Sequence, residues 1–249
     1  MSEINELLDA TKQTVKKVLK ILESKHEIPK KMLFDKKIKR EIKSKIDKDC
    51  EKIIINDLLK TSIPMLSEET EGLTFSNQKG LLWVIDPLDG TVNYLRNFGN
   101  CSVSIALFKD NEPVFGVIGE FPSKSIFWGG PKIKSFKGKE GINVSKINNK
   151  KKAILCTGFP SRYIFNRTNE KNFFEKIKKF SKIRMIGSAS LSLIKLSQGQ
   201  AEAYLEENIM IWDVAAGLAI LRGSGGKYKI SKGSYKNAIN VIAHNGVIL

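Results

Sequence analysis

An apolar run that ends in two closely spaced carboxylates constrains this chain more than any other segment. Residues 81–85 read Leu-Leu-Trp-Val-Ile, and residues 86–91 continue as Asp-Pro-Leu-Asp-Gly-Thr. The apolar run predicts a strand buried on both faces, with Asp86 at its C-terminal end. Pro87 cannot extend a hydrogen-bonded ladder and Gly90 permits an unusual turn, so we expect the chain to reverse here with both carboxylates close together.

Paired carboxylates of this kind are typical of a site for a hard metal ion. Asp86 and Asp89 repel each other unless a cation or a shared proton relieves the repulsion. No His or Cys lies close to them in the sequence, and ligation by oxygen alone favours Mg²⁺ over zinc. On this segment alone, ordinary turn chemistry explains the residues equally well.

Two further acidic segments stand at the edges of apolar runs. Residues 63–66 (Ile-Pro-Met-Leu) are followed by Ser-Glu-Glu-Thr at 67–70, and Ile-Trp at 211–212 is followed by Asp213. Asp213 precedes the helical pattern of residues 214–221, so by itself it is best explained as a cap or as a complement to the helix dipole. The three acidic segments can form one site only if the fold brings these edges together.

The periodicity of the chain predicts a mixed α/β fold. Apolar residues at intervals of three and four predict an amphipathic helix over residues 3–24 and a second helix over 44–60. Helical patterns return later in the chain, and short apolar runs between turn residues predict strands. The predicted strands are 81–86, 101–108, 114–121, 125–129 and 153–157, and the later helices are 169–180, 189–199 and 213–222. The lysine-dense segment 28–40, interrupted by Pro29, is predicted to be mobile.

Length and composition fit one globular domain. The 249 residues, 41% of them hydrophobic, suffice for a single α/β domain over 1–249 with a sizeable core. No apolar run approaches the length of a membrane span and the N-terminus is charged rather than signal-like, so we expect a cytoplasmic protein without a membrane partner. The three cysteines, Cys50, Cys101 and Cys156, are odd in number and widely spaced, which favours reduced thiols.

The formal charge of +16 and the pI of about 9.6 allow two interpretations. Clustered lysines and arginines neutralise phosphates, so one interpretation is nucleic-acid binding. The lysines of this chain are instead scattered over nearly every polar segment without regular aromatic residues between them. We therefore favour a lysine-rich surface without a nucleic-acid partner, whose charge could still steer anionic phosphate substrates into a site.

Taken together, the acidic segments resemble those of one protein family. The set comprises Glu68-Glu69-Thr70, residues 83–91, Trp212-Asp213 and, after eleven intervening residues, Gly225-Gly226. This spacing is similar to that of the inositol monophosphatase family, in the superfamily of Mg²⁺-dependent, lithium-inhibited phosphatases that also contains fructose-1,6-bisphosphatases and bisphosphate nucleotidases. The resemblance extends to a final strand around residues 239–243. It implies the layered α/β/α/β/α sandwich of that family, with segment 28–40 as a flap over the metal site.

The resemblance also implies two Mg²⁺ ions and their ligands. Glu68, Asp86 and the backbone carbonyl of Leu88 would hold the activating ion. Asp86 would bridge to a second ion, which Asp89 and Asp213 complete, and a third, weaker Mg²⁺ near Glu68 occurs in this family. Carboxylates around two Mg²⁺ ions roughly balance their charge and leave positions for water and phosphate.

By the same resemblance, Thr91 orients the attacking water and Asp47 is the carboxylate paired with it. The family usually has hydroxyl residues one and three positions before this Asp. Here Ser44 keeps the earlier position, whereas Ile46 replaces the nearer one. This departure leaves open the alternative that Asp47 is a plain surface acid on the second helix.

Substrate contacts are implied at three places. Backbone N–H groups at Gly90 and Thr91 would open a short helix that binds phosphate. The loop of Gly187, Ser188 and Ala189 matches the family loop that contacts the substrate, although a routine helix start with a Ser cap explains it as well. Glu206, seven residues before Asp213, matches a glutamate that bonds a substrate hydroxyl, and the neighbouring Glu207 is the alternative.

The sequence therefore predicts a Mg²⁺-dependent, lithium-sensitive phosphomonoesterase for a small polyol, sugar or nucleotide phosphate, with inositol 1-phosphate as the leading substrate. Residues 93–94, Asn-Tyr, also resemble the inositol monophosphatase side of the superfamily. The alternatives are fructose-1,6-bisphosphate, adenosine 3′,5′-bisphosphate and histidinol phosphate, because members of one fold differ in substrate through few residues. The resemblance implies a homodimer. A different class of function, an RNA- or transcription-complex-associated factor with secondary catalysis, is motivated by the charge alone.

Overall fold

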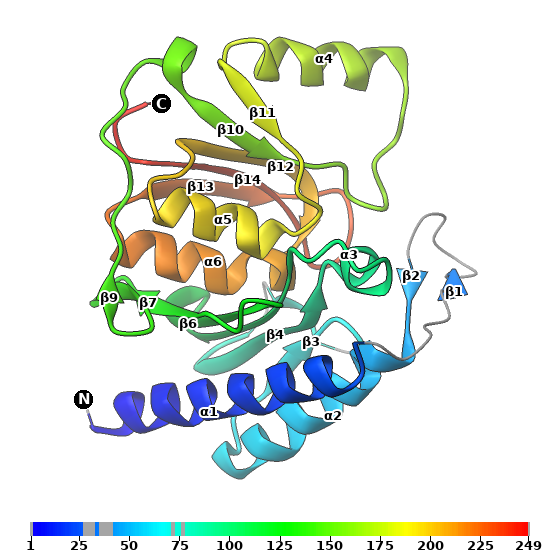
Figure 1. Cartoon of the computed structure of the whole chain (residues 1–249), viewed down its shortest axis with the longest axis vertical. Helices are drawn as coiled ribbons and strands as arrows, with labels where there is room; N and C mark the ends of the chain where they lie inside the picture. Colours follow the sequence, from blue (N-terminus) through cyan, green and yellow to red (C-terminus); the bar gives the residue numbers. More distant parts are fainter. Residues whose placement is uncertain (1, 27–32, 35–41, 71–72, 76–77, 249) are drawn as a thin grey trace.

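The structure is a computed structural model, and it describes residues 2–26, 33–34, 42–70, 73–75 and 78–248. Within these residues, layers of helices alternate with two sheets, from α1 and α2 at one end to α4 at the other (Figure 1). Hydrophobic clusters fill the spaces between successive layers. The predicted α/β/α/β/α sandwich is thus confirmed.

The first layer consists of two helices, α1 (Ser2–Ser24) and α2 (Lys45–Leu58), the second continued by the 3₁₀ turn η1 (Leu59–Thr61). The centre of the apolar side of α1 is buried and its edge residues are partly buried, whereas its polar side faces solvent. Such a one-sided pattern is typical of a helix on the outside of a core. The two helices pack against one face of the first sheet through Val15, Leu22 and Ile54.

The second layer is a seven-stranded sheet in the order β3-β4-β5-β6-β7-β8-β9. Only β3 and β4 run parallel; every other neighbouring pair is antiparallel. Its strands are β3 (Met65–Ser67), β4 (Leu81–Asp89), β5 (Cys101–Lys109), β6 (Glu112–Phe121), β7 (Ile126–Gly130), β8 (Ile133–Lys137) and β9 (Glu140–Gly141).

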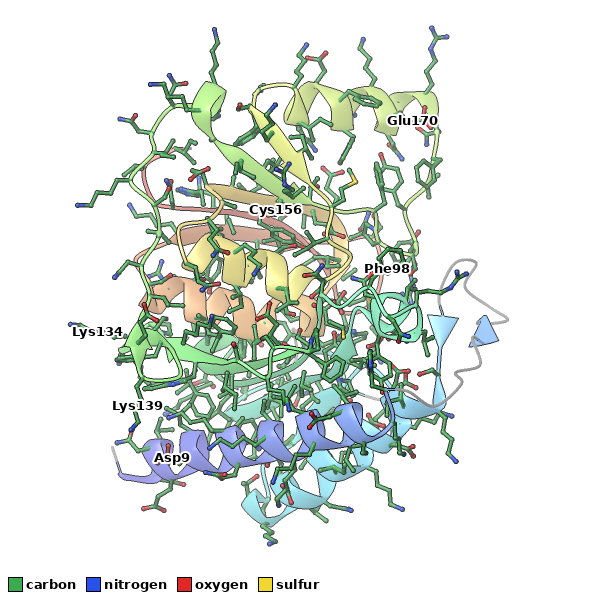
Figure 2. The ribbon with its side chains drawn as sticks, in the orientation of Figure 1. Asp9, Phe98, Lys134, Lys139, Cys156 and Glu170 are labelled. Atoms are coloured by element: carbon green, nitrogen blue, oxygen red, sulfur yellow. The ribbon has the colours of Figure 1, made fainter. Side chains whose placement is uncertain are left out.

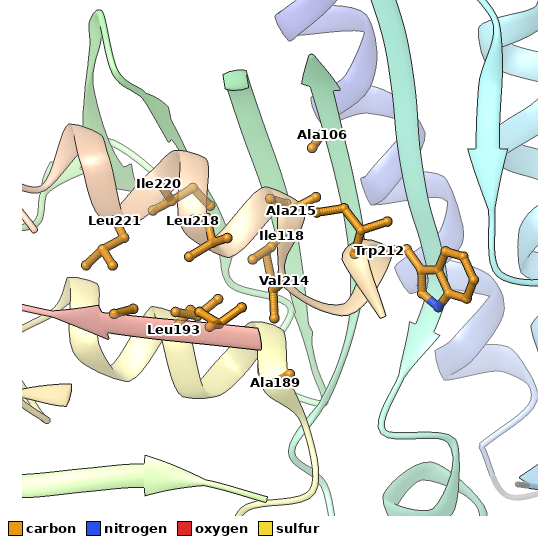
Figure 3. Close-up of a cluster of buried hydrophobic side chains, with 14 of the residues drawn as sticks. Ala106, Ile118, Ala189, Leu193, Trp212, Val214, Ala215, Leu218, Ile220 and Leu221 are labelled. Atoms are coloured by element: carbon orange, nitrogen blue, oxygen red, sulfur yellow. The ribbon is translucent and has the colours of Figure 1, made fainter. Parts of the chain in front are cut away.

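Two helices that are buried on nearly all sides, α5 (Ala189–Ser197) and α6 (Ile211–Gly223), form the middle layer. A helix without a polar face is stable only where it is covered on all sides, and these two lie between the sheets. Figure 3 shows Leu193 of α5 and Leu218 of α6 within the cluster that also includes Ile118 of the first sheet. This layer fixes where Asp213, in the first turn of α6, meets the strands.

The fourth layer is a five-stranded sheet in the order β11-β10-β12-β14-β13. The outer helix α4 (Arg167–Ile177) lies over its far side, where Ile177 packs against a small cluster around Leu155. Cys156 is enclosed on the inner side (Figure 2), and all three cysteines are buried. The strands are β10 (Ile154–Thr157), β11 (Lys182–Arg184), β12 (Ala203–Met210), β13 (Lys227–Lys232) and β14 (Ala238–His244).

The remaining elements are short. They are the two-residue strands β1 (Leu33–Phe34) and β2 (Ile42–Lys43), the helix α3 (Thr91–Leu95) and the 3₁₀ turn η3 (Lys150–Lys152). The segment predicted to be a mobile flap, 28–40, lies outside the described residues except for β1. In the part of the chain that the structure describes, no helix combines the length and the apolar character needed to cross a membrane.

Most predicted elements occur where expected, but several strands differ from the prediction. The strand predicted to end at residue 86 continues to Asp89, and β12 was not predicted at all. The centre of β12 reads Glu-Glu-Asn at 206–208, so its alternation is broken, and its ladder with β14 is irregular at the same place. Strands β8, β9, β11 and β13 also escaped prediction because they are short or rich in lysine.

One close contact between layers provides a test of the packing. A Cβ atom added to Gly116 of β6 would lie 2.3 Å from the backbone oxygen of Ala216 in α6. Backbone cannot move aside as a side chain can, so we expect Gly116→Ala to lower the free energy of unfolding by about 2 to 3 kcal/mol. Urea unfolding would measure this, with Gly141→Ala in β9 as the control, because a Cβ at Gly141 meets nothing within 4 Å. Equal stability of the two variants would contradict the close approach.

Candidate functional site

Asp86 and Asp89 lie on one face of the first sheet because β4 contains a bulge between them. Asp86 pairs with Ser104 of β5 and Asp89 pairs with Ser102, so two residues of β4 stand opposite one residue of β5. In a regular strand, residues three apart point to opposite faces, and one extra residue restores the same face. Pro87 is tolerated here because a bulge leaves a residue out of the ladder. The expectation that the strand ends at Asp86 was wrong, because the ladder continues past Pro87 to Asp89.

The chain turns only after Asp89. Gly90 has a φ of +87°, a left-handed conformation, and a Cβ there would lie 3.0 Å from the carbonyl oxygen of Asn100. Glycine is therefore required for both conformation and space. Helix α3 begins at Thr91 directly afterwards, which places the Thr91 hydroxyl beside the bulge.

Glu68 and Asp213 reach the same region from two other elements. Glu68 follows β3, which runs parallel to β4, and its backbone N–H donates to the carbonyl of Ile85 at 3.3 Å. Asp213 lies in the first turn of α6 and accepts a hydrogen bond from the backbone N–H of Met210. The N-cap position of α6 is Met210, and Asp213 accepts the N–H of that residue from the first turn, where a carboxylate also complements the helix dipole.

These side chains surround one cavity of about 760 Å³. Among the predicted site residues, seven line it: Glu68, Asp89, Gly187, Ser188, Ala189, Glu206 and Asp213. The others, Asp47, Asp86, Leu88, Gly90 and Thr91, do not line it directly. Asp86 is 1% exposed and Leu88 is also buried, so they lie beneath the surface of this region.

The carboxyl groups raise one another's pKa. Burial raises the pKa of Asp86 well above its ordinary value, and the charges of Glu68, Asp89 and Asp213 raise it further. The pKa of Asp213 is raised well above its ordinary value by burial first and then by neighbouring acids. A set of oxygen donors with this mutual repulsion fits a hard divalent cation, which would neutralise it. As the described side chains stand, no three His, Cys, Asp or Glu are grouped closely enough to enclose an ion.

Asp47 is connected to Thr91 and is no surface residue. The Thr91 hydroxyl donates to Asp47 Oδ1 at 2.7 Å, while the backbone N–H and the hydroxyl of Ser44 donate to Oδ2 at 2.9 and 2.5 Å. Asp47 is 3% exposed, because α2 begins with a capping box of Ser44 and Asp47 whose carboxylate faces the sheet. Burial raises the pKa of Asp47, although its hydrogen bonds lower it. Ser44, which stands at one of the two positions where the family usually has a hydroxyl residue, therefore holds the carboxylate of Asp47.

Glu206 points into the cavity, whereas its neighbour does not. Glu206 is 9% exposed, and the hydroxyl of Tyr204 donates to its Oε2 at 2.7 Å. Burial raises the pKa of Glu206 to about 7. Glu207 is paired with Lys176 at the outer side of the second sheet and does not line the cavity. The ambiguity between the two glutamates is therefore resolved in favour of Glu206 as the cavity residue.

The loop before α5 binds Asp89 as well as capping the helix. Ser188 is the N-cap and accepts from the backbone N–H of Leu191 at 3.2 Å, while its hydroxyl donates to Asp89 Oδ2 at 2.6 Å. The backbone N–H groups of Ala189 and Ser190 also donate to Asp89. The first amides of this helix are therefore used by a carboxylate of the protein itself.

Several residues of this region escaped sequence reasoning. Ser190 touches Asp89, and Ser102 touches Ser190. The cavity is also lined by Arg162 and Lys236, whose positive charges lie far in sequence from any acidic segment. Only the small-residue stretch at 187–190 gave a signal for Ser190, and nothing in the sequence pointed to the other three.

Comparison with known proteins agrees with this geometry. A family profile described as "Inositol monophosphatase family" matches residues 3–248. The chain is 35% identical over 187 residues to "Nus factor SuhB" of Xylella fastidiosa, which covers 74% of this chain and 66% of that protein. It is 32% identical over 149 residues to "Fructose-1,6-bisphosphatase/inositol-1-monophosphatase" of Aquifex aeolicus, covering 59% of this chain and 56% of that protein. These matches thus span less than two thirds of either relative.

The fold has a similar counterpart among solved structures. The extragenic suppressor protein suhB from Bartonella henselae superposes with a TM-score of 0.84 at 27% identity, covering 96% of this chain and 94% of that one. A score at this level over nearly all of both chains means that the order and packing of the layers are shared.

Proposed function

The chain belongs to the inositol monophosphatase family, and from this premise we propose that it is a Mg²⁺-dependent phosphomonoesterase acting on a small polyol or sugar phosphate, with inositol 1-phosphate as the leading substrate. The observation that carries the proposal is the hydrogen bond from Thr91 to the buried Asp47, together with four interacting carboxylates, three of which line one cavity while Asp86 lies beneath it. Carboxylates alone would suit many metal proteins. A hydroxyl held by a buried carboxylate adds a means to position a water and take its proton.

Two Mg²⁺ ions, with a possible third near Glu68, would be held by the residues around the bulge. Glu68, Asp86 and the carbonyl of Leu88 would hold one ion, and Asp86, Asp89 and Asp213 the other. Bound Mg²⁺ would supply positive charge that lowers the pKa of a water and offsets the charge of the phosphate. The bulge supports this assignment, because without it Asp86 and Asp89 would point to opposite faces of the sheet.

Thr91 and Asp47 would handle the proton of the attacking water. A threonine hydroxyl has a single proton, and where it is donated to Asp47 the oxygen lone pairs can accept only from a donor such as water. This orients a lone pair of the water away from Thr91, toward a phosphorus atom in the cavity. The raised pKa of Asp47, caused by burial, makes this carboxylate a better acceptor for the proton that the water gives up.

The phosphate would lie at the edge of the cavity and reach backbone that does not line it, whereas the leaving group would lie within the cavity. We assign the phosphate to the backbone at Gly90 and Thr91, and the leaving group to Gly187, Ser188, Ala189 and Glu206. The amides at the start of α5 already donate to Asp89, so the loop before that helix would contact the substrate mainly through its exposed backbone. Arg162 and Lys236 at the same cavity favour an anionic substrate.

Glu206 should set the preference for a polyol. We expect Glu206→Gln to raise KM for inositol 1-phosphate about tenfold with little change in kcat, since a hydrogen bond to a charged group is lost. Because the pKa of Glu206 is about 7, its ionised fraction grows between pH 6 and 8. KM of the wild type should therefore fall over this range, and KM of the variant should not.

The control for this prediction is Glu207→Gln. Glu207 carries the same charge but pairs with Lys176 outside the cavity, so its replacement should leave KM and its pH dependence unchanged. Equal effects of the two substitutions would show that a general change of charge is responsible, and would remove Glu206 from the substrate site.

The substrate can be tested with a panel of phosphate esters. Phosphate release would be followed from inositol 1-phosphate, fructose-1,6-bisphosphate, adenosine 3′,5′-bisphosphate and histidinol phosphate, with Mg²⁺ and again with added Li⁺. We expect turnover that requires Mg²⁺, falls with Li⁺ and is fastest for inositol 1-phosphate. Preference for another ester would correct the substrate but keep the phosphatase, whereas no turnover of any ester would contradict the proposal.

A second function is motivated by the charge of +16 and by the similarity to a protein named as a Nus factor. In this alternative the chain associates with RNA or a transcription complex, and catalysis is secondary. Binding through phosphate contacts weakens steeply with salt. Retention of RNA at moderate salt, with a steep salt dependence, would favour this alternative, and loss of all binding at that salt would exclude it.

We also propose a homodimer, as the family resemblance implies. Sedimentation at several protein concentrations would distinguish a dimer from a monomer.

A further inference from the structure

The carboxylate of Asp89 is held by a set of hydrogen bonds that treats its two oxygens unequally. Oδ2 accepts three: from the Ser188 hydroxyl at 2.6 Å, from the Ser190 backbone N–H at 2.8 Å and from the Ser190 hydroxyl at 2.5 Å. From the residues that the structure describes, Oδ1 accepts one hydrogen bond, from the backbone N–H of Ala189 at 3.3 Å. Each carboxylate oxygen has about two lone-pair directions. Oδ2 is therefore saturated, and Oδ1 is the oxygen that keeps capacity for another partner.

The Ser190 hydroxyl is itself oriented by a residue from the first sheet. Ser102 of β5 lies 2.5 Å from Ser190, oxygen to oxygen, and both side chains are fully buried. Ser190 has one hydroxyl proton, and the short contact to Asp89 uses it. Ser190 must then accept a hydrogen bond from the Ser102 hydroxyl. Donation therefore runs in one direction, from Ser102 to Ser190 and from Ser190 to Asp89.

The bulge in β4 also explains why Ser102 is available. The extra residue brings Asp89 opposite Ser102 in the β4–β5 ladder. The start of α5 packs against this pair through Ser188 and Ser190. Asp89, Ser102 and Ser190 come from β4, β5 and α5. Their hydrogen bonds therefore connect the first sheet to the middle layer of helices. A carboxylate fixed in this way loses little conformational freedom when it binds an ion.

We propose that Ser190 and Ser102 are positioning residues that hold Asp89 so that it offers a single oxygen, Oδ1, to a divalent cation. This inference rests on the proposed function, in which Asp89 is a ligand of the second ion and not of the first. Residues that hydrogen-bond to a metal ligand without touching the metal typically change metal affinity by about 10- to 100-fold when they are removed.

Binding of Mn²⁺, followed by the EPR signal of the free ion, tests this without any measurement of activity. The variants are Ser190→Ala and Ser102→Ala, alone and combined. Ser102→Ala is the cleaner variant, because it leaves every direct contact to Asp89 in place. The matched control is Ser197→Ala, which removes a buried hydroxyl from the other end of the same helix, where it donates to the Leu193 carbonyl at 2.8 Å. Ser190→Thr should restore affinity because it keeps the hydroxyl.

The wild type is expected to bind two classes of Mn²⁺. Ser190→Ala should raise Kd of one class about tenfold and leave the other within about twofold, since only one ion contacts Asp89. Ser102→Ala should raise the same Kd by a smaller factor, and the double variant should resemble Ser190→Ala, because Ser102 acts through Ser190.

Three results would overturn the proposal. They are an unchanged Kd in Ser190→Ala, equal weakening of both classes, and equal weakening in Ser197→Ala, which would indicate a general loss of packing. A wild type that binds no Mn²⁺ would overturn the proposed function itself, and with it this inference. The Mn²⁺ titration of the wild type therefore distinguishes failure of the proposed function from failure of this inference.

Discussion

Asp86→Asn is expected to abolish Mg²⁺-dependent phosphate release while making the protein without metal more stable. Asp86 is assigned to both ions, so its loss should reduce kcat/KM at least a thousandfold, or about 4 kcal/mol of transition-state stabilisation. Asn has the shape of Asp and keeps an oxygen that accepts a hydrogen bond from the Leu88 backbone N–H. In the wild type this nitrogen lies 3.0 Å from Asp86 Oδ1. The fold should therefore persist, and a loss of activity will report on the site alone.

The stability effect follows from the raised pKa of Asp86, which burial and the neighbouring acids cause. An acid whose pKa is higher in the folded state destabilises that state increasingly as pH rises from its ordinary value of 3.8 toward the raised one. Without metal at pH 7.5, the Asn variant should melt about 3 °C or more above the wild type. Mg²⁺ should raise Tm of the wild type and leave that of the variant unchanged.

The control is Asp9→Asn, the same change on the outer face of α1, where the side chain points to solvent (Figure 2). It should alter neither turnover nor the response to Mg²⁺. If Asp86→Asn kept Mg²⁺-dependent turnover, Asp86 would not be a metal ligand. A lower Tm of the metal-free variant would contradict the electrostatic account of this carboxylate.

Thr91→Ala is expected to reduce kcat by a factor of about 100 to 10,000, the usual contribution of a positioned proton acceptor. Mn²⁺ affinity should change by no more than about twofold, since the carboxylates and the Leu88 carbonyl remain, and the carbonyl loses only its 3.0 Å contact with the Thr91 hydroxyl. Asp47→Asn should have a similar effect, and the double variant should be little worse than either single one. In the proposed mechanism the two groups act in series, because Asp47 would reach the water through the hydroxyl of Thr91, which donates to it.

Two substitutions separate this role from a loss of structure. Thr91→Ser keeps the hydroxyl and should recover most of kcat, whereas Thr11→Ala, which removes a hydroxyl that bonds the Leu7 carbonyl within α1, should leave kcat unchanged. Single-turnover kinetics would measure the chemical step directly. Additive losses in the double variant, or a large change in metal affinity for Thr91→Ala, would show that the two residues do not act as a pair.

Much of the fold could be predicted because its layers leave local patterns. The one-sided apolar stripe of α1 predicts an outer helix, and the apolar character of α6 on all sides predicts a covered one. The acidic residues could be selected because each ends an apolar run. That they would meet was inferred from a family resemblance, since nothing in local sequence states which strand edges adjoin.

The features that escaped prediction depend on pairing between distant residues. The bulge that puts Asp86 and Asp89 on one face exists only in register with β5. The contact between Ser102 and Ser190 joins residues 88 positions apart, and two small polar residues inside apolar runs carry no local signal. β12 was missed because Glu206, which faces the cavity, interrupts the pattern that identifies a strand. The strands that carry the site residues are thus those whose sequences depart from the regular local patterns of a strand.

The most direct measurement is anomalous diffraction from crystals of catalytically active protein grown with Mn²⁺. The account predicts one peak beside Asp86, Glu68 and the Leu88 carbonyl, and a second beside Asp86, Asp89 and Asp213, with Asp89 bound through a single oxygen. Mn²⁺ bound elsewhere, or no peak at these carboxylates in protein that turns over phosphate esters, would contradict the assignment of this cavity as the metal-dependent active site.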